Sequence, residues 1–432
     1  MPTRNASTIL AVLRIVRGWS QADLAKAAGV RPATISDWER GKKTPSVPTL
    51  ERLTAIMGYP TSLVVRADAF VEEATESRSL PAAPADLSGR IEALAVAYGR
   101  EVADFVRSGL KRLTAEAAAL QERCRAPYLW ERLRQYGTAE SEQWSRSAGS
   151  SQNWALCELL CEESIRATAD LPERAVELAE LALLVAPRVP EEGLHLGLQG
   201  YAWAFLGNAR RVRGDLRSAD EAFGRSAELW QAGSPEVRDL LDGARLMDLE
   251  ASLRRDQRRL GEALRLLDRA LSLKQGEAAG RLLVKKSKTL EELGDPKGAV
   301  AALRQAASLI GEDCEPRLRL CIRFNLLVNL CALGSYREAE YLAPTVRALT
   351  ERLGNRMDLV RLRWLEGRIA AGLGRAAAAV EILREVRGDF ARQGIGYDMA
   401  LVTLELAELL LSERRAGEVK DLARNCAASL GT

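Results

Sequence analysis

The sequence of 432 residues predicts an all-α protein, in which a small N-terminal helical domain precedes a long series of helical hairpins. Two observations carry this prediction. In residues 1–66, apolar residues recur at helical spacing, and runs of β-branched residues are almost absent. From residue 151 onward, a unit of two helices joined by a glycine turn recurs at steps of 36 to 44 residues. A chain of this length also exceeds one ordinary core, so we expect more than one domain.

Positive charge is concentrated at the N-terminal end of the chain. Residues 1–66 contain ten Lys and Arg residues against four Asp and Glu residues, whereas the whole chain has a formal net charge of only +3. The rest of the chain is therefore mildly acidic. A basic small domain on an acidic body indicates that the small domain contacts a polyanion.

The scarcity of histidine excludes several classes of catalytic and metal site. The chain has one histidine, His195, and its sequence contains no phosphate-binding glycine loop and no serine-nucleophile motif. We therefore expect no enzyme activity, no catalytic or metal-ligating residues and no cofactor. No apolar run in the sequence is as long as a membrane span, and the first ten residues lack the apolar core of a signal peptide. We expect a cytoplasmic protein without a membrane partner.

Two helices are expected before residue 30. The first has an apolar face made of Ile9, Leu10, Leu13 and Val16. Ser20 is a suitable N-cap for the second helix, because Asp23 three residues later comes close to completing a capping box. The second helix buries Leu24, Ala25 and Ala28, and we expect it to end at Gly29.

A third and a fourth helix complete the expected core of this domain. Pro32 suits the first turn of the third helix, where its missing N–H costs nothing. Ile35 and Trp38 face inward, and Gly41 ends the helix. The fourth helix has an inward face made of Leu50, Leu53, Ile56 and Met57. Two helices joined by a short glycine turn give the geometry of a helix-turn-helix.

The segment SQADLAKAAGVRPATISDWERGKKTPS, residues 20–46, resembles the lambda-repressor-like, Xre-type helix-turn-helix family. The resemblance implies a five-helix DNA-binding domain over residues 1–66. It also implies that Gln21 clamps a DNA phosphate at the N-terminus of the second helix. The side chains that would face base edges are Arg31, Ala33, Ser36 and Asp37. Those that would contact phosphates are Arg40, Lys42 and Lys43. Glu39 would pair with Arg14 inside the domain, because an unpaired carboxylate there is costly.

The stripe expected to read bases has few strong hydrogen-bonding groups. It contains no Asn or Gln, and Ala33 can offer only an apolar contact. Asp37 can accept from a cytosine amino group but repels phosphates, so Arg31 is the best candidate to bind guanine. We therefore expect modest specificity for each half-site, with dimerisation or DNA shape supplying the rest.

Between this domain and the repeats, the sequence predicts a linker and a helical connector. The linker is expected over residues 67–90, because residues 74–90 are rich in Ser, Ala and Pro and lack periodicity. Residues 91–150 form the expected connector. Its first helical pattern has a candidate break at Gly109, and residues 126–136 suggest a further helix. The connector could serve dimerisation or docking.

Residues 151–432 are expected to form a solenoid of helical hairpins. The turn glycines are Gly214, Gly294, Gly334 and Gly374, and the alanines five residues later are Ala219, Ala299, Ala339 and Ala379. Weaker copies place Ala175, Ala263 and Val419 at the same phase. Small residues let paired helices approach, and glycine permits a left-handed turn. The residues that most resemble the tetratricopeptide signature are Trp203, Leu206, Gly207, Gly214, Ala219 and Phe223.

A solenoid of this kind presents a concave surface that usually binds a peptide or a protein. The first helices of the repeats are expected to form this ligand groove with Asn208, Arg211, Asn325, Trp364 and Arg368. Asparagine can clamp a peptide backbone. The many arginines on the same faces favour a ligand with a free carboxylate or acidic side chains.

The combination of this N-terminal motif with tetratricopeptide-like repeats resembles bacterial peptide-sensing transcriptional regulators. The resemblance implies a regulator that binds double-stranded DNA, forms a homodimer and senses a peptide or protein with its repeats. An interaction scaffold with a degenerate helix-turn-helix head is the main alternative, and the weak base-reading stripe motivates it. In a second alternative the repeats serve only for oligomerisation, and an enzyme is a distant third.

Overall fold

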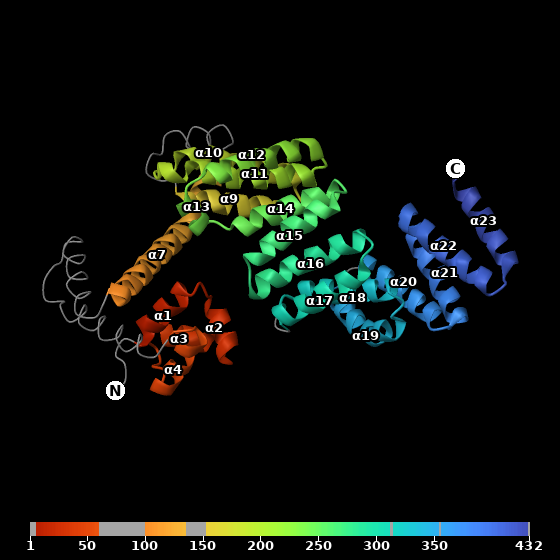
Figure 1. The fold of residues 1–432 in the computed structure, drawn as a ribbon. Coiled ribbons are helices and arrows are strands. Elements are labelled where there is room, and N and C mark those ends of the chain that lie inside the picture. The colour runs from red at the N-terminus through yellow and green to blue at the C-terminus, as the bar shows by residue number, and fades with distance from the viewer. Residues whose placement is uncertain (1–5, 60–99, 135–152, 312–313, 354–355, 431–432) are drawn as a thin grey trace. The chain divides into compact units, whose positions relative to one another are not determined.

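The computed structural model describes residues 6–59, 100–134, 153–311, 314–353 and 356–430 (Figure 1). Within these ranges every regular element is a helix, which confirms the all-α prediction. The chain divides into two compact units, residues 1–242 and 243–432. The domain boundaries predicted at residues 66, 90 and 150 fall outside the described ranges and stay predictions.

The N-terminal domain contains four described helices. They are α1 (Ala6–Val16), α2 (Gln21–Ala28), α3 (Pro32–Glu39) and α4 (Val47–Ile56). The buried core consists of Ile9, Leu10, Leu13, Leu24, Ala25, Ala28, Ile35, Leu50, Leu53 and Met57. Trp38 and Ile56 pack against this core and are partly buried. The helix faces predicted to point inward therefore do so, except that the side chain of Val16 lies outside the described part of the structure. The expected fifth helix and the linker also lie outside the described residues.

Local sequence signals fix the turn between α2 and α3. The Ser20 hydroxyl accepts a hydrogen bond from the Asp23 N–H, and the Asp23 carboxylate accepts one from the Ser20 N–H at 2.9 Å. This reciprocal capping box starts α2. Gly29 then ends α2 with φ at +67°, a backbone conformation that strains any residue with a side chain.

The helix α7 (Arg100–Arg134) is continuous, which corrects two expectations for the connector. No break occurs at Gly109, because a mid-helix glycine costs only about 1 kcal/mol. The further helix expected from residue 126 is the last part of α7, although Pro127 lies inside it. Ala126, Leu129 and Leu133 are buried there, and α7 packs on α9. That burial offsets the backbone hydrogen bond lost at the proline.

The structure describes five further α-helices in the first unit. They are α9 (Trp154–Ala167), α10 (Pro172–Val185), α11 (His195–Val212), α12 (Leu216–Ala232) and α13 (Pro235–Leu240). Short 3₁₀ turns at Ala186–Arg188 and Glu192–Leu194 connect α10 to α11. α11 and α12 approach closely, because a Cβ atom at Gly200 would lie 2.6 Å from the backbone nitrogen of Trp230. Glycine is therefore required there by packing and not by its turn conformation.

The second unit is a series of hairpins in which successive helices pack side by side in chain order (Figure 1). The pairs are α14 (Gly243–Asp256) with α15 (Leu260–Ser272), α16 (Gly276–Glu292) with α17 (Pro296–Ile310), α18 (Pro316–Ala332) with α19 (Tyr336–Leu353), α20 (Arg356–Gly372) with α21 (Ala376–Arg392), and α22 (Gly396–Ser412) with α23 (Ala416–Leu430). The predicted hairpin repeat is thus present.

The repeat phase predicted from the sequence matches the burial of the small residues. Six aligned positions are 0% exposed: Ala175, Ala219, Ala263, Ala299, Ala339 and Ala379. The turn glycines have positive φ, for example +83° at Gly294. The two weaker hairpins α14–α15 and α22–α23 have arginine at this turn position, with φ of +61° at Arg258 and +57° at Arg414. The turn geometry therefore persists without glycine.

The described residues contain neither a candidate membrane span nor a candidate metal site. None of the helices there is both long and apolar enough to cross a membrane. No group of three or more His, Cys, Asp or Glu side chains in the same ranges could hold a metal ion.

Candidate nucleic-acid interface and ligand groove

Glu39, the last residue of α3, accepts hydrogen bonds from two other helices of the N-terminal domain. Arg14 of α1 donates from Nε to Oε1 at 2.6 Å and from Nη2 to Oε2 at 3.0 Å. Gln21 of α2 donates from Nε2 to Oε2 at 2.7 Å. The side chains of Arg14 and Glu39 are only 12% and 6% exposed. The ion pair expected from the family resemblance is present, and one carboxylate links α1, α2 and α3.

The contact between Gln21 and Glu39 restrains the amide that was expected to clamp a phosphate. Gln21 is the first residue of α2, so its backbone N–H has no partner within the helix and can bind an anion. The side-chain amide has two N–H donors, of which Glu39 needs only one. Sequence reasoning missed this contact, because it assigned the carboxylate of Glu39 to Arg14 alone.

The residues expected to read bases lie on or directly before α3. Arg31 is the N-cap residue of α3 in extended conformation, and both Arg31 and Ala33 are exposed. Ser36 and Asp37 are half-buried. The Ser36 hydroxyl accepts a hydrogen bond from Arg40 Nη2 at 2.6 Å. The candidate base contact and the candidate phosphate contact are therefore bound to each other in this structure.

The cations expected to contact phosphates follow α3 directly. Arg40, Lys42 and Lys43 are all exposed. The backbone N–H groups of Lys42 and Lys43 donate to the Asp37 carbonyl oxygen at 2.9 and 3.3 Å, which closes the C-terminus of α3. The cationic side chains thus extend from a hydrogen-bonded turn. This arrangement suits contact with a polyanion along one edge of α3.

The ligand-groove residues predicted in the first unit are paired with each other. Asn208 of α11 is 4% exposed, and its Oδ1 accepts from Nη2 of Arg211 at 3.0 Å. Asn325, Trp364 and Arg368 belong to the second unit. Asn325 on α18 accepts at its carbonyl oxygen from Asn329 Nδ2 at 2.8 Å.

Trp364 and Arg368 of α20 meet at a residue that sequence reasoning missed, Glu405 of α22. Trp364 Nε1 donates to Oε2 of Glu405 at 2.7 Å, and Arg368 Nε donates to Oε1 at 2.9 Å. The guanidinium carbon of Arg368 also lies 5.2 Å from the centre of the Trp364 ring. Glu405 follows Arg368 by 37 residues, about one repeat, so a search for opposite charges one repeat apart could have found it.

Similar polar contacts join other neighbouring first helices of the second unit. Lys285 of α16 lies 2.5 Å from a carboxylate oxygen of Asp248 on α14. Arg317 of α18 lies 3.1 Å from Asp358 of α20. Lys285 and Arg317 therefore each have an acidic neighbour about one repeat away. Arg368 is likewise paired, with Glu405, and the acidic ligand that the arginine content favours stays a prediction.

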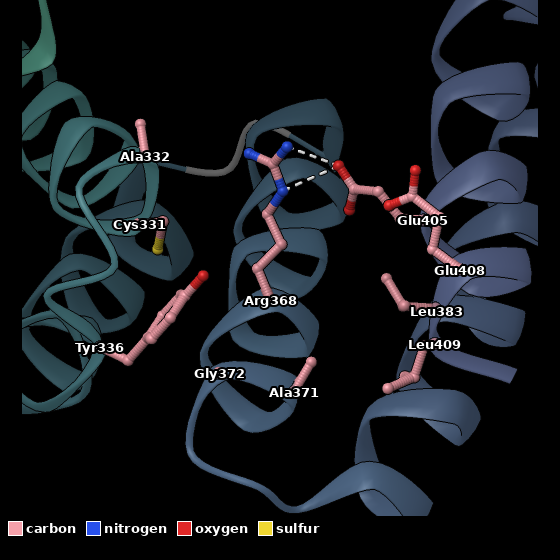
Figure 2. A pocket seen from close by; sticks show the side chains of 10 residues that line it. All are labelled: Cys331, Ala332, Tyr336, Arg368, Ala371, Gly372, Leu383, Glu405, Glu408 and Leu409. Atoms are coloured by element: carbon pink, nitrogen blue, oxygen red, sulfur yellow. Dashed lines mark hydrogen bonds and ion pairs between the residues drawn. The ribbon is translucent and has the colours of Figure 1, made fainter. Parts of the chain in front are cut away.

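A pocket of about 420 Å³ lies between α18, α20 and α22 (Figure 2). It is lined by Cys331, Ala332, Tyr336, Arg368, Ala371, Gly372, Leu383, Glu405, Glu408 and Leu409. Burial raises the pKa of the Cys331 thiol to about 11, so this group is neutral at physiological pH. The pocket therefore includes one of the predicted groove residues, Arg368, together with two carboxylates.

Residues 10–64 match a family of helix-turn-helix domains. A search of curated proteins found no match. Among solved structures, aspartyl phosphate phosphatase F from Bacillus subtilis is 11% identical, with 98% of this chain and 93% of that chain covered and a TM-score of 0.44. PlcR of Bacillus thuringiensis, in complex with the peptide PapR7 and DNA, is 11% identical, with coverages of 92% and 98% and a TM-score of 0.23.

The TPR-like repeats of a kinesin light chain from Podosopora anserina are 17% identical, with coverages of 45% and 95% and a TM-score of 0.35. Similarities this weak to solved structures carry no argument about the function of this chain. The family match is different in kind, because it falls on α1 to α4 and their capped turn. Residues 10–64 are a helix-turn-helix domain.

Proposed function

We propose that the chain is a sequence-specific, DNA-binding transcriptional regulator whose repeats bind a peptide or protein ligand and form a homodimer. The helix-turn-helix domain with exposed cations beside α3 is the observation that carries this proposal. The proposal places the protein in the cytoplasm and includes no membrane partner, cofactor or enzyme activity.

In the DNA complex, α3 enters the major groove and the surrounding groups bind phosphates. Gln21 and the N-terminus of α2 hold one phosphate, while Arg40, Lys42 and Lys43 contact others. Arg31, Ala33, Ser36 and Asp37 face base edges. The hydrogen bond between Arg40 and Ser36 must open if both side chains contact DNA separately.

The repeats supply the regulatory input in this proposal. Asn208, Arg211, Asn325, Trp364 and Arg368 stay the candidate ligand contacts. A ligand changes DNA affinity only if it binds one arrangement of the two DNA-binding domains better than another. A homodimer provides two such domains and lets a palindromic operator compensate for modest reading by each one.

The salt dependence of DNA binding tests the first part of the proposal. Fluorescence anisotropy of a mixed-sequence duplex should show tight binding by the full-length chain at low salt, with affinity falling as salt rises. The triple variant Arg40→Ala, Lys42→Ala, Lys43→Ala should reduce the slope of log K against log salt by about 0.9 for each lost phosphate contact. Lys297→Ala, an exposed lysine on α17, is the control and should leave the slope unchanged.

An unchanged slope in the triple variant would remove the assigned interface. Absence of salt-dependent binding by the wild-type chain would favour the alternative, a tetratricopeptide-like interaction scaffold whose head no longer reads DNA. The reason to keep this alternative is that the base-reading stripe has few strong hydrogen-bonding groups.

A further inference from the structure

We infer that the pocket between α18, α20 and α22 binds the cationic end of a ligand, a primary ammonium or guanidinium group carried on an apolar chain. The inference rests on the proposed ligand binding by the repeats, and it names the chemistry that the ligand presents to this one site. It differs from the acidic ligand that the arginine content of the sequence favours.

The pocket has a floor and two walls (Figure 2). Arg368, Ala371 and Gly372 of α20 form the floor. Cys331 and Ala332 of α18, with Tyr336 from the start of α19, form one wall, and residues of α22 form the opposite wall. A volume of about 420 Å³ is large enough for a side chain of several carbon atoms but not for a folded partner.

The charges that line the pocket leave an unbalanced carboxylate. Arg368 is neutralised by Glu405, which also accepts from the Trp364 indole N–H. Glu408, one turn further along α22, is exposed and has no hydrogen bond or ion pair to any part of the chain that the structure describes. The Cys331 thiol is neutral at physiological pH, so it neither adds to this negative charge nor balances it. A cationic group is therefore the complement that this lining lacks.

The apolar part of the lining is built around the ring of Tyr336. A Cβ atom added to Gly372 would lie 2.2 Å from Cδ2 and Cε2 of this ring, so the ring packs directly on the glycine backbone. Leu383 and Leu409 supply further apolar surface. The ring lies on the wall opposite the carboxylates of α22. An aromatic ring and a carboxylate that line the same pocket both favour a cation, and the leucines favour an alkyl chain.

Two sources could present this chemistry, the side chain of a basic residue in a peptide or a free diamine. Titration calorimetry of the full-length chain separates them with three probes: acetyl-Ala-Ala-Lys-Ala-Ala-amide, the same peptide with norleucine in place of lysine, and 1,5-diaminopentane. The lysine peptide should bind at least about fivefold more tightly than the norleucine peptide. Equal binding by the diamine alone would identify a free amine as the source.

Variants connect this preference to the pocket. Glu408→Gln, which removes one exposed charge, should lower the affinity for the lysine probe about fivefold and leave the norleucine peptide unaffected. Glu381→Gln, at an exposed carboxylate of α21 outside the pocket, is the matched control and should have no effect. Gly372→Ala should displace the Tyr336 ring and weaken the lysine probe severalfold, while circular dichroism shows unchanged helicity.

Equal affinity for the lysine and norleucine peptides, no response to Glu408→Gln, or no binding of either amine probe at millimolar concentration would overturn the inference. DNA binding is measured separately, by anisotropy with and without the bound probe. Amine binding that leaves DNA affinity unchanged would support the pocket and count against regulation through it. If the chain binds DNA in a salt-dependent way but binds none of the three probes, the pocket inference fails and the proposed DNA-binding function stands.

Discussion

Arg14 and Glu39 form a two-point ion pair between α1 and α3, with Nε and Oε1 2.6 Å apart and Nη2 and Oε2 3.0 Å apart. Because both side chains are largely buried, neither charge can be solvated if its partner is removed. Gln21 shares the same carboxylate, so the ion pair also positions a candidate phosphate contact. The stability of the domain and its DNA affinity are therefore expected to change together.

Removal of the carboxylate should destabilise the N-terminal domain strongly. Glu39→Ala leaves the guanidinium of Arg14 buried without an anion and should cost about 3–5 kcal/mol of unfolding free energy. The double variant Arg14→Met, Glu39→Leu buries no charge and should lose much less. Hydrogen exchange at the buried Leu13 and Leu24 amides measures both effects. Equal losses in the single and double variants would show that the charge is not what matters.

Arg31 and Arg40 should affect DNA binding in different ways. Arg40→Ala removes a candidate phosphate contact, so it should weaken binding to all sequences by a similar factor. Arg31→Ala removes a candidate base contact and should cost about 1–3 kcal/mol on the preferred sequence and little on others. Parallel titrations of a preferred and a scrambled duplex make the comparison. A uniform loss for Arg31→Ala would contradict its assignment to base reading.

Replacement of Arg414 by glycine should stabilise the second unit. Arg414 has φ of +57° at a turn where other repeats have glycine, and this conformation strains an L-residue with a side chain. Relief of that strain, less the added entropy of the unfolded chain, should gain about 0.5–1 kcal/mol. The converse variant Gly374→Arg, at φ of +78°, should lose a similar or larger amount. Urea unfolding followed by circular dichroism tests both, and a destabilised Arg414→Gly would be inconsistent with the strain.

Two glycines in the α11–α12 hairpin should respond to alanine with opposite signs. Gly200→Ala places a methyl group 2.6 Å from the Trp230 backbone nitrogen and should cost about 1–3 kcal/mol or more, because the helices must separate. Gly224 lies in α12 with open space around its Cα, so Gly224→Ala should gain up to about 1 kcal/mol from helix propensity. Thermal unfolding of both variants is the measurement, and a stabilised Gly200→Ala would disprove the close packing.

Alkaline pH should destabilise the second unit through Cys331. Burial raises the pKa of its thiol from an ordinary value of 9.0 to about 11. The neutral thiol is favoured in the folded state, so its contribution is fully present below pH 9 and is lost as pH rises toward 11. The loss amounts to about 2–3 kcal/mol. Urea midpoints at about pH 8 and pH 10.5 should therefore fall less in Cys331→Ala than in the wild type. Parallel decreases in the two proteins would exclude this thiol as the cause.

Much of the fold follows from local sequence rules. The capping box at Ser20, the buried face of α2 and the phase of the repeats depend on residues close together in the chain, and the structure confirms them. An alanine that recurs once in each repeat indicates where paired helices are in contact, since only a small side chain permits close approach. Arg258 and Arg414 show that the hairpin turn keeps its position in the repeat even where arginine replaces the turn glycine.

The features that sequence reasoning missed all depend on contacts between distant residues. α7 continues through Gly109 and Pro127, because packing on α9 outweighs a weak local preference. Glu405 binds Trp364 and Arg368 from the next hairpin, and Gln21 reaches Glu39 from a neighbouring helix. Helical periodicity places a side chain on a face, but it does not name the partner on the facing helix.

The most direct test of the central claim is a selection of genomic DNA fragments by the purified full-length chain at near-physiological salt. The proposed dimeric regulator predicts enrichment of one motif with two half-sites about 10 base pairs, or a multiple of that, apart. The Arg31→Ala variant should then enrich an altered motif. Retention of DNA without any enriched sequence, in the wild type as in the variant, would contradict sequence-specific recognition by α3 and leave the head as a general anion-binding surface.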